Sequence, residues 1–259
     1  MLIPGIQGRW EWMAPAVTAL SRTCRVVTES LPGDQGSSSA LDTTRGFDTF
    51  VDWLDELLER NGLEQASVCG VSYGGLIALR YAARRPERVA RLILASTPSP
   101  SWTPNCRIER YLRAPRLMSS IFVFSSFFRL YPEIAAAFPR LSTRAAFCVR
   151  HLRRVTKYRF APTTMAERVR LLTGTDFAAD CARVRAPTLV VTGSTGLDRV
   201  VDIAGTREYV GLIPGARWAE VAGTGHIGLV TRPDRFAAAV SQFLGDVTAV
   251  PSERRRVSA

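Results

Sequence analysis

A serine lies at the centre of a short glycine-flanked motif. Residues 70–74 read Gly-Val-Ser-Tyr-Gly, which is a G-x-S-x-G pattern with Ser72 in the middle. A strand-like apolar run precedes the motif at 66–69, and a helix-like run follows it at 75–85. A sharp turn from a strand into a helix exposes the serine hydroxyl, and the helix N-terminus favours developing negative charge. This context predicts that Ser72 is a nucleophile rather than an incidental residue of a tight turn.

A serine hydroxyl is a poor nucleophile at neutral pH and needs a base held by a third group. The chain has only two histidines. His226 lies in a glycine-flanked loop after the strand-like segment 216–221, a place that suits a mobile imidazole. His151 lies among arginines in a helix-like stretch, and we interpret it as a surface histidine. His226 is therefore the predicted base.

The carboxylate that orients the base is expected after another strand. Segment 187–193 is apolar and rich in β-branched residues, which is typical of a buried strand. Asp198 follows it, whereas Asp202 begins the next helical pattern and is interpreted as its N-cap. The order Ser72, Asp198, His226 is nucleophile, acid, base, which differs from the orders of chymotrypsin and subtilisin.

These motifs resemble the α/β-hydrolase fold, in particular its capped esterases, lipases and haloperoxidase-like hydrolases. The resemblance covers residues 1–98 and 181–245, and it is carried by segments 2–8, 30–37 and 70–75 together with Asp198 and the Gly225-His226 pair. It implies an oxyanion hole made by the backbone N–H groups of Ile6 and Tyr73. Such proteins usually carry His-Gly where this chain has Pro4-Gly5, but a backbone donor at Ile6 needs no particular side chain.

The elements alternate between helix and strand. The expected helices span 12–21, 43–61, 73–85, 202–212 and 232–244, and the expected strands span 24–30, 66–71, 91–97, 187–193 and 216–221. Such alternation predicts an α/β fold with a mostly parallel, doubly wound sheet and ligands at the carboxyl ends of its strands. Residues 1–4 already read as the strand before the oxyanion loop, so the usual N-terminal edge strands are missing or the true start lies upstream.

Positive charge is concentrated between the two halves of the resemblance. Residues 1–97 hold 10 basic and 11 acidic side chains, residues 98–180 hold 14 and 5, and residues 181–259 hold 10 and 7. We expect 1–98 and 181–245 to form the hydrolase core, 99–180 an inserted helical cap, and 246–259 a flexible tail. The aromatic run 118–131, whose only charge is Arg129, is expected to line an acyl or aromatic pocket.

Three interpretations of the basic cap remain open. Its arginines form an ordinary solvated face, attract acidic substrates or an anionic membrane surface, or bind nucleic acid. No recognised motif accompanies the charge, so nucleic acid is not expected as a partner. Membrane contact is possible on this pattern but is not the favoured interpretation, and the oligomeric state is not predicted.

Composition narrows the remaining classes. No run of about 18 uncharged apolar residues predicts a transmembrane helix, and no signal-peptide pattern is present. The cysteines at 24, 69, 106, 148 and 181 are scattered without metal-ligand spacing, which favours reduced thiols in a cytoplasm. We expect no metal and no organic cofactor.

The predicted function is a serine hydrolase that cleaves a carboxylic ester or thioester through an acyl-enzyme. Its expected partner is a small acyl substrate, hydrophobic or anionic. Acyl transfer by the same triad, and a non-catalytic ligand receptor or a lyase of the same fold, remain the alternatives.

Overall fold

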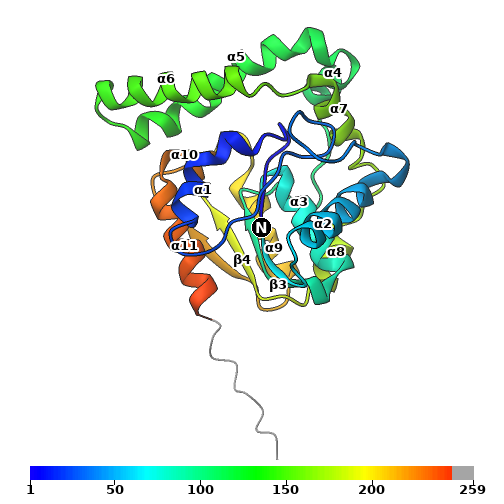
Figure 1. Cartoon of the computed structure of the whole chain (residues 1–259). Helices are drawn as coiled ribbons and strands as arrows, with labels where there is room; N and C mark the ends of the chain where they lie inside the picture. Colours follow the sequence, from blue (N-terminus) through cyan, green and yellow to red (C-terminus); the bar gives the residue numbers. More distant parts are fainter. Residues whose placement is uncertain (247–259) are drawn as a thin grey trace, which may run out of the picture.

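Five parallel strands form the sheet at the centre of the computed structural model, which describes residues 1–246 (Figure 1). They lie in chain order across the sheet: β1 (Leu2–Ile3), β2 (Ala66–Val71), β3 (Val89–Ala95), β4 (Thr188–Thr192) and β5 (Arg217–Glu220). Every neighbouring pair is parallel. The predicted parallel α/β fold is confirmed. Of the flexible tail predicted at 246–259, all residues after 246 lie outside the described residues.

The central strands are apolar on both faces because helices cover both faces of the sheet. Val68, Leu92 and Val190 belong to the core on one face, and Cys69, Ile93 and Val191 belong to the core on the other. The first face is covered by α2 (Thr49–Arg60), α3 (Tyr73–Arg84), α8 (Phe177–Arg183) and α9 (Ile203–Leu212), and the second by α1 (Ala14–Leu20), α10 (Gly228–Thr231) and α11 (Pro233–Gly245).

The strand predicted at 24–30 is wrong. This segment has no regular secondary structure and lies beside β1, where the Leu2 N–H donates to the Val27 carbonyl at 2.9 Å. The Thr28 hydroxyl adds one bond to the Leu2 carbonyl at 2.7 Å. Because β1 has only two residues, it offers too few backbone groups for a longer ladder at this edge.

The single helix predicted at 43–61 is also wrong in one respect. The structure has a 3₁₀ segment (η2, Thr43–Asp48) before α2, and Gly46 breaks the helical path with φ of 58°. Positive φ is open to glycine at little cost, so the chain turns there before α2 begins. A second short 3₁₀ segment (η1, Trp10–Met13) precedes α1. The other predicted helices and strands begin and end within two residues of the observed ones.

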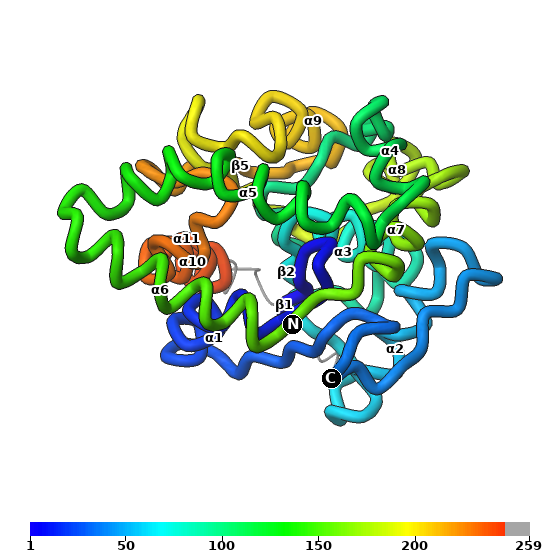
Figure 2. The backbone as a smooth tube through the Cα atoms, turned by 90° about the horizontal axis from the view of Figure 1, so that it is seen from above, coloured from blue at the N-terminus to red at the C-terminus, as the bar shows by residue number. Residues whose placement is uncertain are grey.

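Between β3 and β4 the chain forms α4 (Cys106–Arg113), α5 (Pro115–Ala137), α6 (Leu141–Lys157), α7 (Pro162–Arg170) and then α8. Figures 1 and 2 show α4 to α7 lying together over one end of the sheet, with α5 and α6 running in opposite directions. In contrast, α8 packs against α3 on the sheet's own face. The boundary predicted between residues 180 and 181 falls inside α8, and the division into core and cap stays a prediction.

Only one face of α5 turns toward the sheet. Phe122 and Arg129 line a cavity below it, whereas Phe124, Phe127 and Phe128 are 68%, 51% and 57% exposed. The expectation that the run 118–131 lines a pocket therefore holds for part of the run. None of the helices in residues 1–246 is both long enough and apolar enough to cross a membrane.

Candidate active site

Ser72 occupies a strained turn between β2 and α3. Its backbone has φ of 54° and ψ of −123°, a conformation that costs a residue with a side chain about 1–3 kcal/mol. The turn is held at its start by the Ser72 N–H, which donates to the Ala95 carbonyl at the end of β3 at 2.8 Å. The chain therefore leaves the sheet abruptly, as the sequence predicts for a nucleophile elbow.

The glycines of the motif allow three close approaches. A Cβ at Gly70 would collide with the backbone of Gly74, and a Cβ at Gly74 would lie 2.5 Å from the Pro4 carbonyl oxygen. A Cβ at Gly75 would collide with the side chain of Thr97. Small residues are thus required on both arms of the turn, because backbone lies where side chains would stand.

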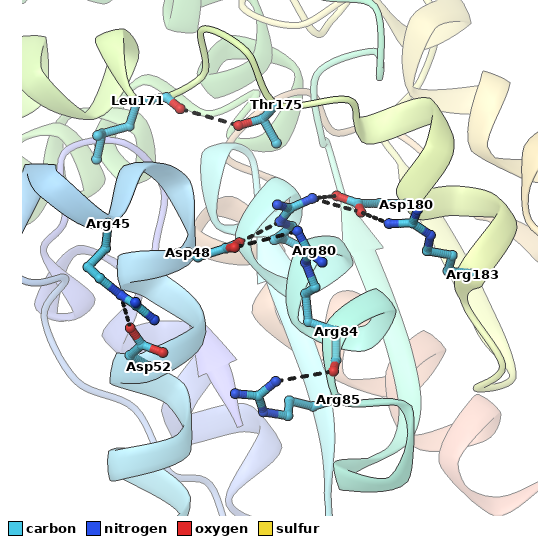
Figure 3. A network of polar contacts seen from close by, with 10 residues as sticks. All are labelled: Arg45, Asp48, Asp52, Arg80, Arg84, Arg85, Leu171, Thr175, Asp180 and Arg183. Carbon is cyan, nitrogen blue, oxygen red and sulfur yellow. Dashed lines mark hydrogen bonds and ion pairs between the residues drawn. The ribbon is translucent and has the colours of Figure 1, made fainter.

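An ion-pair network fixes the helix behind the elbow (Figure 3). Arg80 of α3 donates to Asp48 at 2.7 Å and to Asp180 of α8 at 2.9 Å. The Asp180 side chain is fully buried; burial raises the pKa of this carboxyl, and the Arg80 hydrogen bond and charge oppose that shift. Breaking such a buried pair is costly, so α3 is held against its neighbours with its N-terminus at Ser72.

Asp198 and His226 meet in the loops that follow β4 and β5. The Asp198 Oδ2 atom lies 3.2 Å from His226 Nδ1, and Asp198 Oδ1 accepts the N–H groups of Val200 and Val201 at 2.9 Å each. The carboxylate side chain is only 2% exposed. Both of its oxygens are therefore engaged, and one of them faces the imidazole.

The two groups change each other's protonation. Burial alone would raise the pKa of Asp198, but the His226 charge and hydrogen bond, with the two backbone N–H groups, lower it below its usual value. Burial alone would lower the pKa of His226, but the Asp198 charge and hydrogen bond raise it above its usual value. The pair therefore favours an ionised carboxylate beside an imidazole that readily accepts a proton.

A cavity of about 270 Å³ lies between the sheet edge and the inserted helices, and Ser72, Ile6 and Tyr73 line it. A Cβ at Gly5 would stand 3.5 Å from the Ser72 Cβ, so the loop before Ile6 runs beside the elbow. Neither the Ile6 nor the Tyr73 N–H has a hydrogen-bond partner within the described chain. Both donors are therefore unengaged beside Ser72, where the resemblance expects the oxyanion hole.

His226 lies at the same edge, but the structure does not close the full triad. It lines a cavity of about 20 Å³ that is also lined by Val71, the residue before Ser72. No hydrogen bond joins the Ser72 hydroxyl to the imidazole in residues 1–246. The structure thus brings Asp198 and His226 into contact, and within residues 1–246 it joins neither of them to Ser72 by a hydrogen bond.

Sequence reasoning missed Glu133. This fully buried residue of α5 accepts the Ile227 N–H at 2.9 Å and the Thr231 hydroxyl at 3.0 Å. Burial raises the pKa of Glu133, against those hydrogen bonds and the charge of His226. It therefore fixes the loop that carries His226. One signal was available, since Glu133 is the only acidic residue between positions 110 and 166.

Sequence reasoning also missed Arg168. This buried residue of α7 lies 2.5 Å from the Asp34 carboxylate and donates to the carbonyls of Ile6 at 3.1 Å and Pro32 at 2.8 Å. Its own carbonyl accepts the Tyr73 hydroxyl at 2.7 Å. Arg168 thus connects both residues of the expected oxyanion hole to α7. No signal for this role was available in a segment that the resemblance does not reach.

Two other interpretations have clear outcomes. Asp202 is the N-cap of α9, as predicted, and accepts the Ala204 and Gly205 N–H groups. His151 is half-buried rather than a fully exposed surface histidine. Its ring stacks on Phe147 with 5.6 Å between centroids, and burial, with a smaller effect of Arg154, lowers its pKa to about 4. The ring face of Phe147 covers one side of the imidazole despite the surrounding arginines.

The comparisons with known proteins agree with this architecture. Residues 1–239 match the alpha/beta hydrolase family. The chain is 28% identical over 251 residues to a candidate carbamate hydrolase, RutD, of Klebsiella pneumoniae, covering 94% of this chain and 90% of that protein. It is 29% identical over 248 residues to the pimeloyl-[acyl-carrier protein] methyl ester esterase of Aromatoleum aromaticum, covering 91% and 92%.

A solved hydrolase from Pseudomonas aeruginosa superposes with a TM-score of 0.77 at 25% identity, covering 94% of this chain and 88% of that one. The match to the family spans both halves of the sheet and the helices between them. The elbow, the parallel sheet and this match lead to one conclusion: the chain belongs to the alpha/beta hydrolase family.

Proposed function

We propose that this protein is a serine hydrolase that cleaves a carboxylic ester or thioester through an acyl-enzyme intermediate. The observation that carries the proposal is the 3.2 Å contact between Asp198 and His226 at the sheet edge where Ser72 lines a cavity. The strained backbone of Ser72 supports it as well, because strain at a non-glycine residue is common at active sites.

The mechanism assigns one role to each group. His226 Nε2 accepts the proton of Ser72 as the hydroxyl oxygen attacks the substrate carbonyl, and the Asp198 carboxylate stabilises the imidazolium. The N–H groups of Ile6 and Tyr73 stabilise the oxyanion, each contributing about 10²–10³-fold in rate. His226 then protonates the leaving group and later activates the water that releases the acyl group. The Ser72–His226 hydrogen bond forms as substrate binds, since such bonds are often long in free enzymes.

The cavity suits an acyl chain. Its apolar wall comprises Leu76, Ile108, Phe122, Met165, Val169 and Leu172. Its volume of about 270 Å³ lies just under the ~300–1,000 Å³ common for ligand pockets, which favours a small substrate. One relative is named a carbamate hydrolase and another a methyl ester esterase; the second name supports ester chemistry here.

Active-site labelling tests the proposal directly. We expect a fluorophosphonate probe to add to Ser72 in the folded protein, and mass spectrometry of the digested protein locates the adduct. Ser72→Ala should lose the adduct, while Ser142→Ala, which removes an exposed hydroxyl on α6, should retain it.

Turnover of a nitrophenyl ester provides the second measurement. We expect Ser72→Ala to lower kcat by about 10⁶-fold, as for nucleophile removal in other serine hydrolases. An unchanged rate in a folded Ser72→Ala protein would exclude the acyl-enzyme. Probe labelling without ester turnover would favour acyl transfer or another role of the same site.

A further inference from the structure

The cavity that contains Ser72 has an uneven charge. Two arginines, Arg107 and Arg129, line this cavity, and none of the described residues that line it is an aspartate or a glutamate. No carboxylate within residues 1–246 lies within ion-pair distance of either guanidinium. Among the described arginines of α4 to α7, only Arg168 forms an ion pair. Arg107 and Arg129 differ from the other unpaired ones because they line the cavity that contains Ser72.

Arg129 is the inner of the two. Its side chain is half-buried, and within residues 1–246 its Nε has no hydrogen-bond partner and its one side-chain bond is a long one to Ser126 at 3.4 Å. Burial lowers the pKa of Arg129, and the nearby charge of Arg107 lowers it further. The charge of Arg129 in turn opposes protonation of His226. Its guanidinium is therefore partly desolvated, has no ion-pair partner within residues 1–246, and lies within electrostatic range of the imidazole.

Arg107 and Tyr111 complete the polar wall. Arg107 is exposed at the rim, where it donates to Ser125 at 2.8 Å and lies over the Tyr111 ring. Tyr111 lines the same cavity, and its buried hydroxyl has no hydrogen-bond partner among the described residues. Buried donors without partners are costly, and a bound anion would engage those of Tyr111 and Arg129 together.

We propose that Arg129, Arg107 and Tyr111 form a subsite for a carboxylate or phosphate group carried by the acyl part of the substrate. The subsite refines the proposed function and depends on it, since Ser72 must attack the ester at the other end. An apolar wall lies in the same cavity. The substrate class is therefore an ester or thioester of a short apolar acid with a second, anionic end.

Three nitrophenyl esters of equal chain length test this subsite. They end in a carboxylate, a phosphonate or a neutral amide. We expect kcat/KM for at least one anionic ester to exceed that of the amide by roughly tenfold to a hundredfold, the effect of one or two charge-assisted hydrogen bonds. The better of the two anionic esters identifies which anion the subsite takes.

Arg129→Gln should remove most of this preference, measured as the ratio of kcat/KM for the anionic ester to that for the amide ester on the pH plateau, where the effect of Arg129 on the pKa of His226 does not contribute. Arg129→Lys should restore part of it, because the charge returns without the planar guanidinium. The matched control is Arg116→Gln, an exposed arginine of the same helix outside the cavity, which should keep the full preference. Tyr111→Phe should reduce the preference by a smaller factor.

The outcomes separate the two proposals. Turnover of the amide ester with no preference for either anion would overturn the subsite and leave the hydrolase standing. An equal fall for all three esters in Arg129→Gln would also overturn it, because the arginine would then act on the fold or the triad. No turnover of any ester, together with no labelling of Ser72, would remove the proposed function itself.

A binding measurement on Ser72→Ala protein supplies a readout without catalysis. Adipate, a linear dicarboxylate, should bind by calorimetry, and the same titration on Ser72→Ala/Arg129→Gln should weaken by roughly tenfold or more. Equal affinity for both proteins would contradict the assignment of the anion to Arg129.

Discussion

Replacing Arg168 by methionine should destabilise the protein severely. The guanidinium is fully buried, pairs with Asp34 at 2.5 Å, and donates to the carbonyls of Ile6, Leu31 and Pro32. Methionine is unbranched and apolar, shorter than arginine, and has no donor, so the Asp34 carboxylate, itself 1% exposed, would be left in the interior without its ion-pair partner.

The magnitude follows from that unpaired charge. Removing one partner of a buried ion pair typically costs about 3–5 kcal/mol, and each carbonyl that loses a charged donor adds a smaller loss. These losses are not additive, so we expect Arg168→Met to lower the free energy of unfolding by at least about 3 kcal/mol. That is a large part of the ~5–15 kcal/mol that stabilises a typical domain.

The pH dependence gives the sharper check. Burial already raises the pKa of Asp34 against the opposing charge of Arg168, and without that charge the pKa should rise further. A carboxyl whose pKa is higher in the folded state binds more protons there, so stability falls as pH rises through the folded pKa. The deficit of Arg168→Met should therefore shrink as the pH falls through the raised folded pKa of Asp34 toward the ordinary pKa of an aspartate.

Urea unfolding followed by circular dichroism at neutral and acidic pH measures both effects. Adding Asp34→Asn to Arg168→Met should restore stability, because the amide needs no counter-charge. A loss below about 1 kcal/mol, the level of an ordinary surface change, or no recovery in the double variant, would refute the reasoning.

The remaining predictions concern the triad and the elbow. In the wild-type protein, kcat/KM for a neutral ester should rise with pH and level off only above the ordinary imidazole pKa, because the pKa of His226 is raised; a plateau reached at lower pH would contradict this. Asp198→Asn should lower kcat by about 10⁴-fold and move this acid limb to lower pH, because only the charge of Glu133 then opposes the effect of burial on the pKa of His226. Arg129→Gln should move the acid limb to higher pH with the same neutral ester, since the charge of Arg129 opposes protonation of His226. Gly74→Ala should lower the free energy of unfolding by about 1–3 kcal/mol, since its Cβ would stand 2.5 Å from the Pro4 oxygen. Denaturant titration measures this free energy, and a value equal to that of the wild-type protein would contradict the prediction.

Ser72, Asp198 and His226 could be predicted from the sequence because each follows a strand, and a strand is recognised from the pattern of neighbouring apolar residues. A parallel sheet brings the carboxyl ends of its strands to one edge, so three distant residues needed no contact information. The Asp198–His226 contact agrees with that expectation. The roles of the three residues, and of Ile6 and Tyr73, stay predictions.

Glu133 and Arg168 could not be found in this way. Glu133 acts on a loop 94 residues away, and Arg168 on a carbonyl 136 residues away. Both residues belong to helices, and the sequence pattern of these helices does not indicate which face packs against the site. The prediction of a strand at 24–30 was wrong for a related reason. A strand-like composition does not supply the neighbouring strand with which a hydrogen-bonded ladder forms.

The backbone of Ser72 has a consequence for the evolution of this chain. Its φ of 54° is a conformation that glycine reaches without a steric penalty. Thermal denaturation should therefore rank Ser72→Gly above Ser72→Ala, although both lack the hydroxyl. Directed evolution for heat resistance alone would discard the serine at this position, and only selection for activity would keep it.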